Sequence, residues 1–241
     1  MREKKERVNS LSFWEHLEEL RRRILFVLFV WILAGACFYL YSDKILKFLF
    51  APLVPFQPRP VFTRPLEPFM VTFGVSCFAG CLVALPLLIV EIWLFVAPGL
   101  NKEEQKISRL IIPGLVIFSY AGMAFGFFLL VPVALKVLLG FSRGIMMPFL
   151  SAGSYLGFVA VITLGLGVVF NLPVVLGAMG GLGIVQPATL AKNRRLALVG
   201  ALVLAAIITP TTDVVTQLML AAPLVVLYEV GIIFSKIFSK Q

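Results

Sequence analysis

The chain has 241 residues, of which 60% are hydrophobic and 14% are charged, whereas soluble domains carry about 25% charged residues. A water-soluble core of this size cannot hide so many apolar side chains, so the composition indicates a membrane protein and excludes soluble enzymes and disordered chains. The net charge is +9, but the Lys and Arg residues punctuate apolar runs instead of clustering on a soluble face. We therefore expect no nucleic-acid partner and interpret these residues as topology signals.

Six apolar runs, separated by charge clusters, predict an all-α polytopic membrane protein with six transmembrane helices in a single domain over residues 1–241. The runs cover residues 24–41, 69–97, 110–139, 155–179, 195–209 and 214–234. Internal prolines in the second and third runs predict kinks or tilt. The fifth run spans only about 22 Å against a hydrocarbon core of about 30 Å, so it should thin the bilayer or pack in protein.

The Lys and Arg residues are distributed unevenly between the two sides of the predicted spans. Fifteen of the 21 lie at the termini and in the second and fourth loops, which places both termini in the cytoplasm by the positive-inside rule. Residues 1–23 then form a cytoplasmic amphipathic helix. Residues 42–68 contain six prolines and suit an ordered or capping extracytoplasmic loop better than a long helix.

The inventory of catalytic and metal-binding side chains is poor. His16 is the only histidine and lies outside the predicted spans, so a Ser-His dyad, a His-Glu zinc site and a phosphate-binding loop all lack parts. The three cysteines lie inside apolar runs, where small buried hydrophobes are the simplest interpretation. We expect no enzymatic activity, no metal site and no cofactor.

Several carboxylates gather at the predicted cytoplasmic edge of the membrane. Glu19 lies in the N-terminal segment, and Glu103 and Glu104 follow the second span. Glu91 lies one or two turns deeper, where a charge is costly unless it is paired or solvated. Acidic groups here favour a cationic partner, although a solvated, salt-bridged interfacial helix explains the N-terminal segment without any partner.

Short motifs in colinear order from the first helix to the last span resemble one family. They are His16-Leu-Glu-Glu-Leu-Arg-Arg-Arg23, Ala51-Pro-Leu53, Glu67-Pro-Phe69, Trp93-Leu-Phe-Val-Ala-Pro98, Thr209-Pro210 followed by Asp213 and Gln217, and Tyr228-Glu-Val-Gly231. The family is TatC, the polytopic subunit of the twin-arginine protein translocase. Because the similarity covers nearly the whole chain, it is more specific than any single motif.

The resemblance implies a function in protein export. Such a protein is the core and receptor that binds the Arg-Arg signal peptides of folded cargo. It assembles with TatA-like and TatB-like single-span subunits in an oligomeric complex of the bacterial cytoplasmic (inner) membrane, and draws energy from the proton-motive force. A small secondary transporter and a scaffold for another membrane complex are the alternatives.

The resemblance also implies roles for individual residues. The family's signal-binding acids match Glu19 and Glu104, with Glu103 in the same acidic patch, and its basic residues match Arg21 and Arg23. Phe95 matches the aromatic residue beside the patch, although interfacial anchoring explains it equally well.

Polar residues at two further positions in the chain can each be interpreted in two ways. By resemblance, Thr209, Thr216 and Gln217 contact a partner helix, but capping of the turn after Pro210 explains such residues without a partner. In the fourth span, Asn171 stands where the family often has a glutamate. It can form hydrogen bonds but carries no charge, and an interhelical polar contact beside a proline kink is its simplest interpretation.

Overall fold

The structure is a computed structural model that describes residues 13–56, 60–96, 104–140, 149–208 and 214–239. The helices over these ranges are α2 (Phe13–Tyr39), α3 (Ser42–Leu49), α4 (Glu67–Val96), α5 (Glu104–Phe125), α6 (Val131–Gly140), α7 (Ala152–Val169), α8 (Leu172–Gly181), α9 (Pro187–Lys192), α10 (Arg194–Ile208) and α11 (Val214–Phe238). A 3-10 helix, η1, covers Ala51–Phe56, and a π-helical segment, η3, covers Gly126–Leu130.

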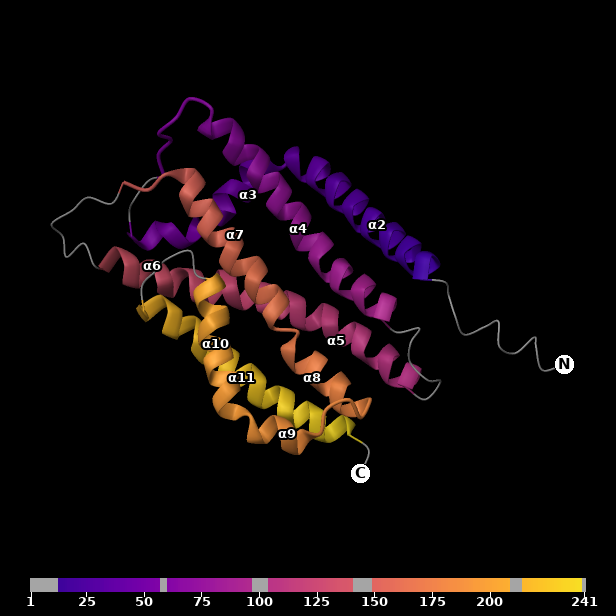
Figure 1. The fold of residues 1–241 in the computed structure, drawn as a ribbon. Helices are drawn as coiled ribbons and strands as arrows, with labels where there is room; N and C mark the ends of the chain where they lie inside the picture. The colour runs from indigo at the N-terminus through magenta and orange to yellow at the C-terminus, as the bar shows by residue number, and fades with distance from the viewer. Residues whose placement is uncertain (1–12, 57–59, 97–103, 141–148, 209–213, 240–241) are drawn as a thin grey trace.

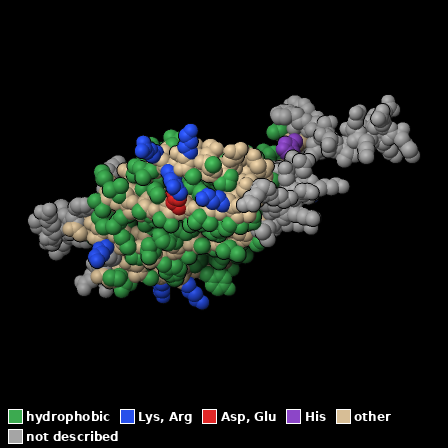
Figure 2. All heavy atoms as spheres, turned by 90° about the horizontal axis from the view of Figure 1, so that it is seen from below, with side chains coloured by type: hydrophobic (Ala, Val, Ile, Leu, Met, Phe, Trp, Pro, Cys, Tyr) green, Lys and Arg blue, Asp and Glu red, His purple; other side chains and the backbone are tan. Residues whose placement is uncertain are grey.

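Six helical segments account for the six predicted spans. Five of them are long and apolar enough to cross a membrane: His16–Tyr39, Glu67–Phe95, Ile111–Gly140, Ala152–Gly181 and Val214–Phe238. The sixth, α10, has only 15 residues, which agrees with the short fifth run of the sequence. Figure 2 shows hydrophobic side chains over most of the described part of one face, with Lys and Arg at a few places. The all-α, six-helix architecture is therefore confirmed.

The N-terminal helix and the first span form one continuous helix. The sequence favours an amphipathic helix over residues 1–23 and a span that starts at Ile24, and α2 includes both from Phe13 to Tyr39 without a break. Residues 1–12 lie outside the described ranges. Neither Gly nor Pro interrupts residues 13–34, so nothing in the backbone ends the helix at the membrane edge. The charged residues are consequently held on the same rigid helix as the span.

Two other spans depart from a continuous α-helix beside prolines. The fourth span breaks at Phe170 and Asn171, between α7 and α8, because Pro173 has no N–H to continue the hydrogen-bond ladder. The third span changes to the π-helical segment η3 directly before Pro132. An extra residue in that turn accommodates a proline ring that would clash with the preceding turn of an α-helix.

The loop between α2 and α4 is tied to the start of α7, at the same end of the molecule in Figure 1. Val61 and Ser151 form an isolated parallel β-bridge. The Glu67 carboxylate accepts hydrogen bonds from the Ser151 hydroxyl at 2.5 Å, the Gly153 N–H at 3.1 Å and the Thr63 N–H at 2.6 Å. The Glu67 carboxylate thus joins residues 60–66 of this loop to the start of α7.

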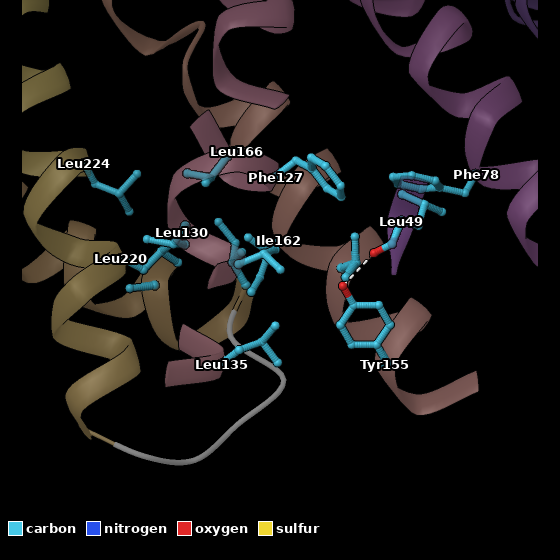
Figure 3. Close-up of a cluster of buried hydrophobic side chains, with 14 of the residues drawn as sticks. Leu49, Phe78, Phe127, Leu130, Leu135, Tyr155, Ile162, Leu166, Leu220 and Leu224 are labelled. Atoms are coloured by element: carbon cyan, nitrogen blue, oxygen red, sulfur yellow. Dashed lines mark hydrogen bonds between the residues drawn. The ribbon is translucent and has the colours of Figure 1, made fainter. Parts of the chain in front are cut away.

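The main core lies where α3, α4, α6, α7 and α11 meet η3 (Figure 3). Its labelled side chains are Leu49, Phe78, Phe127, Leu130, Leu135, Tyr155, Ile162, Leu166, Leu220 and Leu224. The Tyr155 hydroxyl donates to the Leu49 carbonyl oxygen at 2.7 Å, so α3 is fastened onto α7 by a polar contact inside this apolar cluster. Burial of a polar hydroxyl is tolerated there because it is hydrogen-bonded.

Helix α2 packs chiefly against α4, and the two lie side by side in Figure 1. Gly80 of α4 brings the backbones together: a Cβ at this position would lie 2.8 Å from the Trp31 carbonyl oxygen and 3.0 Å from the Gly35 nitrogen. The Trp31 indole N–H donates to the Cys77 carbonyl oxygen at 2.9 Å. This close contact fixes the position of α2 along α4.

A methyl group at Gly80 should force α2 and α4 apart. We expect Gly80→Ala to destabilise the folded protein by about 1 to 3 kcal/mol, because backbone atoms must shift to accept the new carbon. Gly74→Ala is the matched control in the same helix, since a Cβ there meets nothing within 4 Å. Thermal unfolding in detergent measures both variants, and equal stability of the two would contradict the backbone contact.

Candidate functional site

Three charged side chains meet where the start of α2 lies against the end of α4. Arg23 of α2 donates from Nε and Nη2 to Glu19 Oε1 at 3.1 and 2.7 Å, and from Nη1 to Glu91 Oε2 of α4 at 2.5 Å. We call this arrangement the Arg23 bridge (Glu19, Arg23 and Glu91). The side chains are 29%, 24% and 17% exposed, respectively, so the bridge is partly withdrawn from solvent.

The bridge accounts for a carboxylate inside a membrane span. Glu91 belongs to the candidate span of α4, where an unpaired charge is costly. Arg23 compensates this charge with a direct ion pair, and its planar guanidinium reaches two carboxylates at once. The local contact of Glu19 with Arg23 follows from their i,i+4 spacing on α2.

The bridge lines a polar pocket. Glu19, Arg22, Arg23, Phe26 and Glu91 surround a cavity of about 330 Å³, within the range of about 300 to 1,000 Å³ that is typical of ligand pockets. We call it the Arg23 pocket. Two other cavities, between α4 and α7 and between α2 and α4, have mainly apolar linings. Among these three cavities, the Arg23 pocket is the one suited to a charged ligand.

An aromatic stack lies beside the bridge. The rings of His16 and Phe95 are stacked, with centroids 4.1 Å apart and an interplanar angle of 17°. His16 lies on the same face of α2 as Glu19 and Arg23, and Phe95 follows Glu91 by one turn of α4. The His16 Nδ1 is 3.9 Å from Glu19 Oε2. Aromatic surface and carboxylates thus share one corner of the molecule.

The structure brings together only some of the site residues expected from sequence. Glu19, Arg23 and Phe95 meet in this corner, whereas Arg21 is exposed on α2 and does not line the pocket. Glu104 begins α5, but its side chain lies outside the described part. Glu103 lies wholly outside the described residues.

Glu91 is the principal residue that the sequence did not assign to a site. Its position in an apolar run indicates that it needs a partner. The neighbouring sequence does not identify that partner, because Arg23 is 68 residues away. The i,i+4 spacing of Glu91 and Phe95 was the available signal, because it places both on one face of a helix. Arg22 and Phe26 are two further residues that the sequence did not assign to a site, and they are identified by their place in the lining of the Arg23 pocket.

Asn171 forms a second polar contact, inside the helix bundle. It is 4% exposed, and its Nδ2 donates to the Ser119 hydroxyl at 2.9 Å and to the Gly167 carbonyl oxygen at 2.8 Å. The first bond joins the fourth span to α5 beside the break before Pro173. The second satisfies a carbonyl group released where α7 ends.

The expected partner-contact residues are separated by the structure. Gln217 is half-buried, and its Nε2 donates to the Leu202 carbonyl oxygen at 3.0 Å, so it joins α11 to α10. Thr216 is only 1% exposed and packs inside the chain, so its expected place on a partner-facing surface is wrong. Adjacent residues of a helix point in different directions, which separates Thr216 from the outer face. Thr209 lies outside the described residues.

Within the described ranges, no group of three or more His, Cys, Asp or Glu side chains is placed to hold a metal ion. Cys37, Cys77 and Cys81 are free thiols. The lining of the Arg23 pocket contains two carboxylates and two guanidinium groups, which form ion pairs and hydrogen bonds.

Comparison with protein families gives one match over most of the chain. Residues 15–223 match the family model described as Sec-independent protein translocase protein (TatC). A protein of that name from Carboxydothermus hydrogenoformans is 37% identical over 226 residues, which cover 94% of this chain and 93% of the relative. The chloroplastic protein of Pisum sativum is 38% identical over 220 residues, covering 91% of this chain and 62% of the relative.

A solved structure shares the fold. The crystal structure described as twin arginine translocase receptor TatC is 30% identical and superposes with a TM-score of 0.81. The match covers 94% of this chain and 100% of that chain. Similarity therefore extends to the arrangement of the helices as well as to the sequence.

The contacts of Asn171 lead to a prediction about charge. We expect Asn171→Asp to lower stability by at least about 2.5 kcal/mol, because an ionised carboxylate cannot donate to Ser119 or Gly167 and is costly within a span. Asn193→Asp at an exposed position is the control and should behave like wild type. Thermal unfolding followed by size-exclusion chromatography measures both, and an unaffected Asn171→Asp protein would refute the requirement for a donor.

Proposed function

Because this chain belongs to the TatC family of Sec-independent protein translocases, we propose that the Arg23 pocket, together with Glu104, binds the paired arginines of export signal peptides. The protein is the core and signal-peptide receptor subunit of the twin-arginine translocase, a component of protein transport and not an enzyme. This membership decides against the alternatives of a small secondary transporter and an unrelated scaffold.

One observation carries the assignment of the pocket: a guanidinium group already lies on Glu19. The two contacts from Arg23 to Glu19 Oε1, at 3.1 and 2.7 Å, indicate that this carboxylate is accessible to a guanidinium in a suitable orientation. Glu19 is also 29% exposed, so a ligand can approach it. A planar guanidinium forms directed pairs with carboxylates that an ammonium cannot reproduce, which favours Arg over Lys.

Orientation in the membrane belongs to the same proposal. The excess of Lys and Arg at the termini and in two loops supports cytoplasmic N- and C-termini in the bacterial inner membrane. In this orientation, the Arg23 pocket faces the cytoplasm, where unexported cargo is found. The energy then comes from the proton-motive force, with no bound cofactor.

We also assign TatA-like and TatB-like single-span subunits to the hairpin of α10 and α11. The half-buried Gln217 bonds to Leu202 of α10, and the exposed apolar side chains of this hairpin include Val214 and Leu218 on α11 and Ile207 on α10. An apolar surface with one polar group suits a transmembrane partner helix. The shortness of α10 adds a reason for a protein neighbour, because lipid alone must thin to match it.

Glu19→Gln and Glu104→Gln should each weaken binding of an Arg-Arg signal peptide by roughly ten- to a hundredfold. Each substitution removes one charge-assisted contact of about 1.5 to 3 kcal/mol, and the double variant should lose binding. Affinity is measured with purified protein and a fluorescent peptide at physiological salt. A Lys-Lys peptide should bind the wild-type protein more weakly.

Glu18→Gln and Glu103→Gln are the matched controls, because each neighbours a proposed binding acid. A diffuse negative patch would make all four single variants act alike, with strong salt dependence. Unchanged affinity in the Glu19→Gln/Glu104→Gln protein would show that the binding site has been assigned to the wrong residues.

A photo-cross-linking residue in place of Gln217 should capture a small single-span subunit in membranes that support export. The same residue at Val226, which is exposed on the opposite face of α11, should label mainly lipid. Adducts are identified by mass spectrometry. Absence of a protein adduct at Gln217, or equal capture at both positions, would contradict a partner surface centred on Gln217.

A further inference from the structure

We propose that Arg23 is a resident arginine that holds Glu19 until a signal peptide binds, and that Glu91 is the positioning residue that retains Arg23 when a signal arginine takes Glu19. This inference rests on the proposed function of the Arg23 pocket. It adds a residue to the site and gives the Arg23 bridge a role in exchange between two guanidinium groups.

The geometry of the bridge permits such an exchange. Both contacts from Arg23 to Glu19 use a single carboxylate oxygen, Oε1, while a different nitrogen, Nη1, contacts Glu91. The other Glu19 oxygen, Oε2, has the His16 ring nitrogen at 3.9 Å, which is beyond hydrogen-bond distance. An incoming guanidinium can therefore approach Glu19 on the Oε2 side before Arg23 leaves.

The charge of the pocket requires Glu91. The lining contains two carboxylates, Glu19 and Glu91, and two guanidinium groups, Arg22 and Arg23, so its formal charge is zero. Without Glu91 the lining would be positive, and Arg23 would have Glu19 as its remaining carboxylate partner in the bridge. Both effects oppose the entry of a cationic signal, since like charges repel and the acceptor is already paired.

Packing gives Glu91 a fixed position from which it can act. It is the least exposed member of the bridge, at 17%, and belongs to a long helix held against α2 by the backbone contact at Gly80. Arg23 has a flexible stem with several rotatable bonds. The exchange thus needs a side-chain movement between two fixed carboxylates and no movement of α2.

A purely structural salt bridge is the competing explanation, and the two explanations predict opposite effects of removing Arg23. If Arg23 competes for Glu19, its removal frees an acceptor and binding becomes tighter. If Arg23 merely fastens α2 to α4, its removal disturbs the pocket and binding becomes weaker. The sign of the change therefore separates the two.

The experiment measures affinity of the full-length protein in nanodiscs for fluorescent Arg-Arg and Lys-Lys signal peptides. We expect Glu91→Gln to weaken Arg-Arg binding about tenfold and Arg23→Gln to tighten it about threefold or more. The affinity of the double variant, Arg23→Gln with Glu91→Gln, should return to within about threefold of wild type. This variant loses both the arginine that competes for Glu19 and the carboxylate that retains that arginine. Glu229→Gln removes an ion pair with Arg194 at another position and should leave the affinity unchanged.

Each other outcome overturns a defined part of the argument. Wild-type affinity in Glu91→Gln, or a double variant as weak as Glu91→Gln alone, removes the exchange but leaves the proposed receptor site standing. Weaker binding in Arg23→Gln identifies a structural salt bridge. If Glu91→Gln does not fold, the Arg23→Gln measurement still decides. A wild-type protein with no preference for Arg-Arg over Lys-Lys overturns the proposed function, and the exchange with it.

Discussion

The close contact between α2 and α4 is the constraint on which the candidate site depends. Helix α2 packs chiefly against this one neighbour, and the backbones meet at Gly80, where no side chain separates them. Two turns from Trp31 toward the start of α2, Arg23 then reaches Glu91 across the same interface. A shift of α2 along α4 by one turn, about 5.4 Å, would break every contact of the bridge with α4.

Charge and burial are handled differently at the membrane edge and inside the bundle. In the Arg23 bridge, groups of opposite charge are paired and still partly exposed. Inside, Asn171 supplies hydrogen-bond donors to Ser119 and Gly167 without any charge. The cost of a charge rises with depth in the bilayer, so an amide is the suitable group where α7 breaks and an ion pair is tolerated where α2 begins.

The two ends of the molecule differ in how many elements their polar contacts join. The long loop is closed onto α7 by the hydrogen bonds of Glu67 and by the bond from Tyr155 to Leu49, which join several elements into one unit. At the other end, the Arg23 bridge involves two helices and leaves room for a ligand in the Arg23 pocket. The end that we propose binds the signal peptide thus lies opposite the end at which Glu67 and Tyr155 join several elements.

Composition and local spacing along the chain are sufficient to predict several features of this protein. The six spans follow from long apolar runs, the short α10 from its residue count, and the pairing of Glu19 with Arg23 from the i,i+4 geometry of a helix. The colinear short motifs also indicate the family without any knowledge of contacts in the fold. These features need only neighbours along the chain, and the structure agrees with them.

The packing of the helices, in contrast, sets which distant groups meet and which way each side chain faces. The position of the charged Glu91 in an apolar run indicates that it needs a partner. Its pairing with Arg23, 68 residues away, depends on how α2 and α4 pack. Likewise, Thr216 and Gln217 are neighbours in sequence, yet one is buried and the other half-buried. Helix packing sets the register and the facing of residues, and in this chain that packing rests on a backbone contact at Gly80, which local patterns do not specify.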